Sequence, residues 1–118
     1  MPRCLWCAAA IVVAVGLACN NPSGGNSCRS VAADVTIDIH DAGGFSPTPV
    51  LVNKGQVVCW ENPGSVTHSV ITSVPATDTI NEVLPPNTLF EHTFTQAPSD
   101  ITYHCGYHPT EQGVITVR

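Results

Sequence analysis

The sequence has little positive charge, a single methionine and no long hydrophobic run. Only four of its 118 residues are Lys or Arg, against nine Asp and Glu. This acidic balance argues against a nucleic-acid-binding protein and favours a basic or neutral partner. The one methionine is Met1, so a domain that begins later in the chain has no thioether to offer a metal. The apolar run from Ala8 to Ala18 is too short to span a bilayer as a helix.

The N-terminal segment has the features of an export signal. Arg3 precedes the apolar run, and a positive residue followed by a short apolar stretch is typical of a signal peptide, here residues 1–18. Val15 to Cys19 resembles a bacterial lipobox, with Gly16 in place of the usual aliphatic residue. We expect lipidation of Cys19, which would anchor the protein to the surface of a bacterial membrane. The alternative is ordinary secretion with Cys19 as a spare thiol.

The residues that follow Cys19 are polar and rich in Gly, Pro and Ser. Such a composition cannot build a core, so residues 19–33 are expected to form a flexible tether. The folded domain is then residues 34–118. Exported domains fold in an oxidising compartment, and we expect this one in the periplasm or at the cell surface.

The domain is predicted to be all-β. Apolar residues alternate with polar ones over short runs that Gly, Pro, Asn and Asp interrupt, which is the pattern of half-buried strands. In residues 56–62, for example, Val58 and Trp60 would share one face, with Cys59 and Glu61 on the other. There is no convincing amphipathic helix and no internal repeat. Seven or eight short strands indicate a Greek-key antiparallel β-sandwich; they are expected at 35–39, 50–53, 56–62, 67–72, 89–94, 101–105 and 113–117, with 45–49 as an edge or crossing segment and 80–84 as a short strand or helical turn.

Three side chains have the types and the placement of a copper site. Cys105 and His108 are separated by two residues in the loop between the last two expected strands, and His68 opens an earlier strand. Loops after alternate strands of a sandwich gather at one end, so the two segments can meet. One thiolate and two imidazoles form the trigonal ligand set of a mononuclear copper site. The alternative, a core thiol with two unrelated histidines, is less consistent with this order.

The remaining cysteines leave a pairing open. Cys4 and Cys7 fall in the signal segment and Cys19 at the lipid site. If Cys105 holds metal, Cys28 and Cys59 could form a disulfide in an oxidising compartment. The other possibility is that each remains a free thiol, because sequence does not show whether the two meet.

The chain resembles the cupredoxins, the small blue-copper family that includes plastocyanin and azurin. This resemblance implies that His68, Cys105 and His108 bind one copper ion that cycles between Cu(I) and Cu(II). It also implies that Asn62 braces the ligand loops by hydrogen bonds. The resemblance rests on residues 45–47 with Val52 and Gly55, then 58–62 and 68–70, then 90–94, 103–109 and 113–117.

The fourth ligand departs from the family pattern. Many relatives have an axial Met three residues after the second histidine, and this chain has Glu111 followed by Gln112. Glu111 could bind through a carboxylate oxygen, as in the red-copper relative nitrosocyanin. Gln112 could bind by its amide oxygen, as in the stellacyanin branch. A third possibility is a backbone carbonyl or water in this position.

The sequence therefore predicts an exported, monomeric copper protein that carries single electrons between exported redox proteins and is not an enzyme. Copper handling or delivery, or a small redox enzyme with a Glu-ligated site, are the alternatives, and zinc would also suit these donors. The other histidines are expected to be structural or exposed. Among them, His104 precedes the ligand cysteine on a strand and should face away from it.

Overall fold

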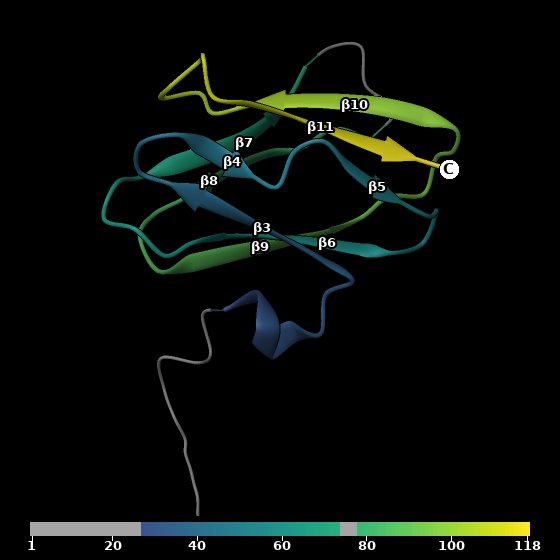
Figure 1. The fold of residues 1–118 in the computed structure, drawn as a ribbon, viewed down its shortest axis with the longest axis horizontal. Helices are drawn as coiled ribbons and strands as arrows, with labels where there is room; N and C mark the ends of the chain where they lie inside the picture. Colours follow the sequence, from purple (N-terminus) through teal and green to yellow (C-terminus); the bar gives the residue numbers. More distant parts are fainter. Residues whose placement is uncertain (1–26, 74–77) are drawn as a thin grey trace, which may run out of the picture.

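The structure is a computed structural model that describes residues 27–73 and 78–118. The described part is built of strands and one short 3-10 helix, η2 (Cys28–Val31) (Figure 1). The predicted signal peptide, Cys19 and the first part of the predicted tether lie outside the described residues. The strands are β3 (Val35–His40), β4 (Gly44–Ser46), β5 (Val50–Val52), β6 (Val57–Asn62), β7 (His68–Thr72), β8 (Asn81–Leu84), β9 (Thr88–Thr93), β10 (Ser99–His104) and β11 (Gln112–Val117).

The strands form two sheets that pack face to face, which confirms the predicted all-β sandwich. One sheet has the order β5-β11-β10-β7-β8 and the other the order β4-β3-β6-β9. Most neighbouring pairs are antiparallel, as predicted, and two are parallel, β3 with β6 and β5 with β11. The described residues hold nine strands rather than seven or eight, because Gly44–Ser46 pairs with β3 and Asn81–Leu84 pairs with β7.

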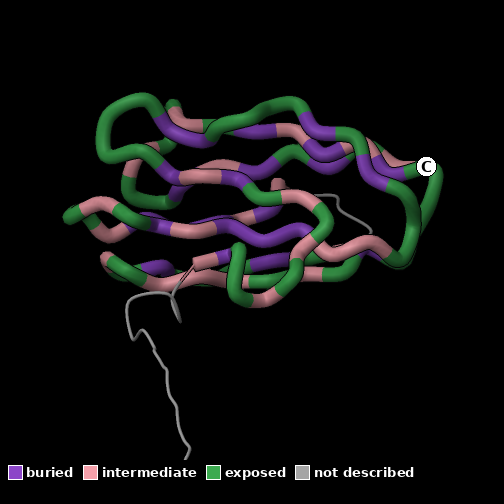
Figure 2. The backbone as a smooth tube through the Cα atoms, turned by 60° about the horizontal axis from the view of Figure 1, so that its bottom comes forward, coloured by how far each residue is buried: buried purple, intermediate pink, exposed green. Residues whose placement is uncertain are grey.

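The core lies between the sheets and follows the alternation in the sequence. Ile37 and Ile39 of β3 are fully buried while Asp38 between them is not. Trp60 of β6 packs edge to face against Tyr103 of β10, with ring centroids 5.6 Å apart. Figure 2 shows this alternation as buried segments that recur along both sheets. Burying one face of every strand fixes the pairing register, because a shift by one residue would turn the apolar side chains outward.

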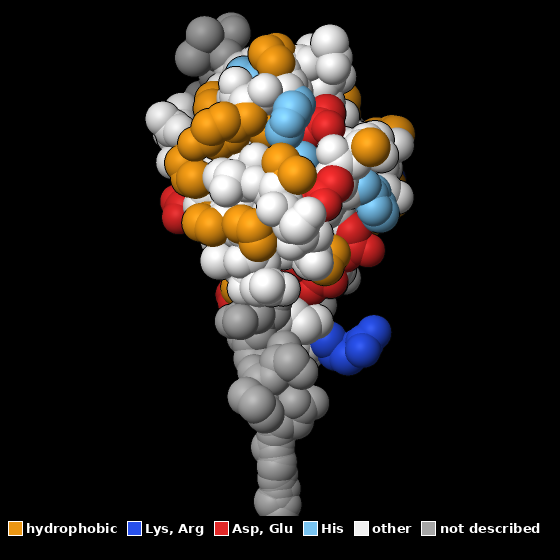
Figure 3. All heavy atoms as spheres, turned by 90° about the vertical axis from the view of Figure 1, so that its left-hand side faces the viewer, with side chains coloured by type: hydrophobic (Ala, Val, Ile, Leu, Met, Phe, Trp, Pro, Cys, Tyr) orange, Lys and Arg blue, Asp and Glu red, His pale blue; other side chains and the backbone are white. Residues whose placement is uncertain are grey.

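One end of the sandwich collects three connections that lie far apart in sequence. The β3–β4 turn, the β6–β7 loop and the β10–β11 loop all lie at the left of Figure 1. Figure 3 faces this end, where histidine side chains lie between hydrophobic side chains on one side and acidic ones on the other. Strand direction explains the gathering, since β3 runs parallel to β6 and β10 runs antiparallel to β7.

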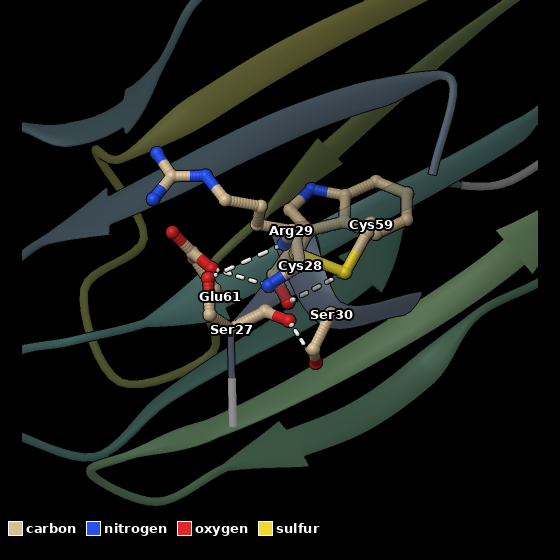
Figure 4. Close-up of a disulfide and its surroundings, with 7 residues drawn as sticks. Ser27, Cys28, Arg29, Ser30, Cys59 and Glu61 are labelled. Atoms are coloured by element: carbon tan, nitrogen blue, oxygen red, sulfur yellow. Dashed lines mark hydrogen bonds between the residues drawn. A yellow bond between two sulfur atoms is a disulfide. The ribbon is translucent and has the colours of Figure 1, made fainter. Parts of the chain in front are cut away.

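A disulfide attaches the N-terminal segment to the outer face of β6. Cys28 and Cys59 are bonded, with Cα atoms 5.8 Å apart (Figure 4). Cys59 does face away from Trp60, but it is fully buried because the chain around η2 covers it. The Cys28 amide also donates a hydrogen bond of 2.6 Å to Glu61 Oε1. Residues 27–33, at the end of the predicted tether, are thus held against the sandwich.

Across residues 27–73 and 78–118, no helix is long and apolar enough to cross a membrane.

Candidate metal centre

Four side chains converge at the loop-rich end of the sandwich. His68, Cys105, His108 and Glu111 each place one potential ligand atom within 4.8 Å of the others. The Cys105 Sγ lies 3.7 Å from His68 Nδ1 and 3.5 Å from His108 Nδ1. Glu111 Oε1 lies 3.3 Å from His68 Nδ1 and 3.4 Å from His108 Nδ1. Within the described residues this is the single group of three or more His, Cys, Asp and Glu with such geometry.

The β10–β11 loop supplies three of these side chains through two consecutive turns. The His108 amide donates to the Cys105 carbonyl at 3.2 Å, and the Glu111 amide donates to the His108 carbonyl at 2.8 Å. The Cys105 amide closes the loop with a 3.0 Å bond to the Glu111 carbonyl. A chain that turns twice at three-residue intervals returns its side chains to one side. The spacing of 105, 108 and 111 therefore directs a thiol, an imidazole and a carboxylate to one point.

Ser69 connects this loop to β7 by two hydrogen bonds. Its amide donates to Cys105 Sγ at 3.4 Å, and its hydroxyl accepts from the Gly106 amide at 2.7 Å. Gly106 fits because a Cβ there would lie 2.8 Å from Ile71 Cδ1. Sequence reasoning missed Ser69. The available signal was a small polar residue directly after His68 and before the apolar residues Val70 and Ile71.

Asn62 holds the loop that leads to His68. Its Nδ2 donates to the carbonyls of Val66 and Leu84 at 2.8 and 2.9 Å. Its Oδ1 accepts from the Gly64 amide at 3.1 Å. Asn62 is 1% exposed and His68 is fully buried. These bonds tie the β6–β7 loop to β8.

Asp41, in the β3–β4 turn, fastens the same loop from the other side. Its Oδ2 accepts from the Ser65 amide and hydroxyl, each at 3.0 Å, and its Oδ1 accepts from the Val66 amide at 3.3 Å. The Ser65 amide is the main reason that the pKa of Asp41 is lowered from its ordinary value. The carboxylate is therefore charged at neutral pH. Asp41 was not singled out from the sequence.

The four donors fit a single metal ion. Typical bonds of 2.0–2.3 Å from a metal to S, N and O place neighbouring donors roughly 3.3–3.8 Å apart. The four donor–donor distances given above, 3.3 to 3.7 Å, fall in this range. Glu111 Oε1 is also buried without a hydrogen-bond partner, and a buried oxygen of this kind is costly unless something binds it. A thiolate with two imidazoles suits copper, and the carboxylate suits Cu(II) or zinc.

Gln112 does not take the place of Glu111. It is the first residue of β11, its side chain is exposed, and its Nε2 donates to the Pro109 carbonyl at 3.4 Å. His92 lies elsewhere, with its ring against Phe94 at a centroid distance of 4.6 Å. His40 and His104 are likewise outside the four-residue group.

The two imidazoles differ in their access to solvent. The His68 side chain is fully buried, whereas the His108 side chain is 36% exposed. Tyr107 next to it is 57% exposed. His108 is therefore the imidazole through which the cluster reaches the surface of the molecule.

Solved structures with this fold include copper proteins. No protein-family model and no curated protein sequence matches the chain. A novel purple cupredoxin from Nitrosopumilus maritimus is 29% identical with a TM-score of 0.62, over 72% of this chain and 100% of that chain. A Cu(I) form of an amicyanin variant is 26% identical with a TM-score of 0.62, over 71% of this chain and 81% of that chain. A reduced amicyanin variant reaches a TM-score of 0.68 over 81% of this chain and 89% of that chain, at 21% identity; at that identity the likeness concerns the fold alone.

The two-sheet topology agrees with the fold of these structures, and the four-donor cluster could hold a metal ion. The chain has the cupredoxin fold and is similar to these proteins.

Proposed function

We propose that the protein binds one copper ion and carries single electrons between exported redox proteins. The observation that carries this proposal is the cluster of His68, Cys105, His108 and Glu111, held inside a rigid sandwich with one imidazole at the surface. When bound, copper supplies a one-electron couple between Cu(I) and Cu(II). The protein then needs to hold the donors in place and give the electron a short path to a partner.

The residues divide these tasks. Cys105 contributes the soft thiolate, and the buried amide of Ser69 donates to its sulfur. The donors are carried by β7 and by the hydrogen-bonded β10–β11 loop. The donor side chains therefore have little freedom to rearrange when the charge at the site changes. The exposed edge of His108 is the port through which we propose that electrons enter and leave.

The proposed location and partner follow from separate features. The Cys28–Cys59 disulfide suits an oxidising compartment, and the N-terminal segment has the pattern of a lipoprotein signal. We therefore propose a protein tethered to a bacterial membrane in the periplasm or at the cell surface. In Figure 3 acidic side chains lie near the histidines, while Lys and Arg appear only at the lower edge. This surface suits a partner with a basic or neutral docking face.

Copper reconstitution of the folded domain tests the proposal. Optical and paramagnetic-resonance spectra should show a thiolate-to-copper charge-transfer band in the visible that Cys105→Ser removes. Voltammetry should show a reversible one-electron couple with fast exchange. A copper-loaded protein without the visible band would refute the thiolate site, and an irreversible couple would refute the carrier role.

A second candidate function follows from Glu111. A carboxylate within 3.4 Å of both imidazoles is a harder ligand than the thioether of many relatives, and it favours Cu(II). The protein could then handle copper, or catalyse a small-molecule redox reaction at an open coordination position. Steady-state turnover with small oxidants would support the enzyme, and metal analysis of protein from its native host would distinguish copper from zinc.

A further inference from the structure

The outer nitrogen of His68 faces a carboxylate. While His68 Nδ1 points to Glu111 and Cys105, its Nε2 lies 3.6 Å from Asp41 Oδ1. His68 is fully buried, and Nε2 has no hydrogen-bond partner at this distance. A buried ring nitrogen of a metal-binding histidine normally donates to a carboxylate, a backbone carbonyl or water. A displacement of about half an ångström would bring Asp41 within hydrogen-bond distance.

The carboxylate of Asp41 is held in this position by the loop that leads to His68. Its three hydrogen bonds to Ser65 and Val66 fix both oxygens toward the loop. Gly64 completes the enclosure, because a Cβ at this position would collide with the Asp41 carboxylate. The β3–β4 turn thus presents one negative charge to the far side of a ligand imidazole.

We propose that Asp41 is a positioning residue for His68 and completes a carboxylate–histidine–metal unit. This inference rests on the proposed copper function. Asp41 accepts the Nε2 hydrogen, which selects the tautomer in which Nδ1 is unprotonated and available to the metal. Its charge also strengthens the imidazole as a donor, which favours Cu(II) over Cu(I). Asp41 touches the ligand and not the metal, so it acts through His68.

The tautomer can be measured without metal. Nitrogen-15 NMR of the metal-free domain at a pH where His68 is neutral should show a protonated Nε2 and an unprotonated Nδ1. The opposite tautomer in the wild-type domain would overturn the proposal. This measurement does not depend on copper chemistry, so its outcome is independent of whether the proposed electron transfer is found.

The charge can be tested with Asp41→Asn, which retains one oxygen for the two Ser65 hydrogen bonds and loses the acceptor for the Val66 amide. We expect roughly 10–100-fold weaker Cu(II) binding, a higher reduction potential and a shifted charge-transfer band. Glu82→Gln removes an exposed carboxylate on β8 and is the matched control, expected to leave all three unchanged. If Asp41→Asn lowers thermal stability but leaves the Cu(II) affinity and the potential at the wild-type values, Asp41 only fastens the loop and the proposal fails.

Discussion

Glu111 lies directly against Gly44. A Cβ on Gly44 would stand 3.1 Å from the Cβ and 3.3 Å from the Cγ of Glu111. Gly44 begins the edge strand β4 with a φ of +78°, a conformation that side chains other than glycine rarely adopt. The absence of a side chain at Gly44 therefore makes room for the carboxylate that sets this site apart from the family pattern.

Gly44→Ala should disturb the metal centre through Glu111. The added methyl group meets the Glu111 side chain, so the carboxylate must shift relative to the two imidazoles. We expect lower stability by about 1–3 kcal/mol from the positive φ and the contact, together with an altered copper spectrum. The control is Gly43→Ala, whose φ is +130° but whose Cβ would have nothing within 4 Å. It should lose stability and keep the wild-type spectrum; equal spectral changes in both variants would contradict this account.

Glu111→Met should move the site toward ordinary blue copper. A thioether is a softer and weaker donor than a carboxylate, so Cu(I) gains relative to Cu(II) and the reduction potential rises. The optical spectrum should shift toward that of blue relatives, and voltammetry measures the change in potential. Gln112→Met, at the neighbouring exposed position, is the control and should have little effect. An unchanged spectrum in Glu111→Met would mean that the carboxylate does not bind the metal.

Ser69→Ala should loosen the ligand loop. It removes the hydroxyl that accepts from the Gly106 amide and leaves a partly buried amide without a partner, at a cost of about 1–3 kcal/mol. The Ser69 amide bond to Cys105 Sγ does not depend on the side chain and should persist. Urea unfolding measures the loss. Ser99→Ala, which removes an exposed hydroxyl bond to the Gln96 carbonyl, should cost much less, and a similar loss in both would show that the Ser69 bond has no special weight.

Removing the disulfide should destabilise the domain without changing the copper site. The bond joins residues separated by 31 positions, and the loop-entropy relation gives about 3–4 kcal/mol for a loop of this length. The double variant Cys28→Ser and Cys59→Ser should unfold at correspondingly lower denaturant. Its charge-transfer band should match the wild type, because the bond lies on the outer face of β6 and the donors lie elsewhere. A lost band in the folded variant would show that η2 supports the site.

The sequence predicts best what depends on local pattern. Alternation placed Val58 and Trp60 in the core and Cys59 on the opposite face, as the structure has them. The spacing of residues 105, 108 and 111 is also local, and it indicated which side chains one loop could bring together. By contrast, the parallel pairing of β3 with β6 depends on how the chain crosses between sheets. Local alternation contains no information on that crossing.

Contacts between distant segments were the hardest to foresee. Strand β4 has only three residues, and its pairing with β3 gives no periodic signal in the sequence. Asp41 gains its role only when the β3–β4 turn meets the β6–β7 loop. Its hydrogen-bond partner Ser65 lies 24 residues further along the chain. The contact between Cys28 and Cys59 is likewise visible only in the structure. For Asp41 and β4 the residue types were visible and the partners were not, whereas Cys28 and Cys59 were already named as a possible pair.

Tyr103 should make the fold sensitive to high pH. Its hydroxyl is buried without a hydrogen-bond partner, and burial raises the pKa of Tyr103 from 10.0 to about 12. Between these values the unfolded chain loses the proton and the folded chain keeps it. Proton loss therefore favours unfolding, and stability falls as pH rises from 10 to 12, by about 1.4 kcal/mol at pH 11.

Tyr103→Phe should remove the part of the stability loss at high pH that comes from ionisation of this tyrosine. Urea unfolding gives the free energy of unfolding of the wild type and the variant at pH 9 and at pH 11. The wild type should lose more stability between the two pH values than the variant. The variant should be no less stable than the wild type at pH 7, because it discards a buried hydroxyl that has no partner. Tyr107→Phe removes a hydroxyl from an exposed side chain and is the matched control. If Tyr103→Phe and the wild type lose equal stability between pH 9 and pH 11, ionisation of Tyr103 is not what weakens the sandwich.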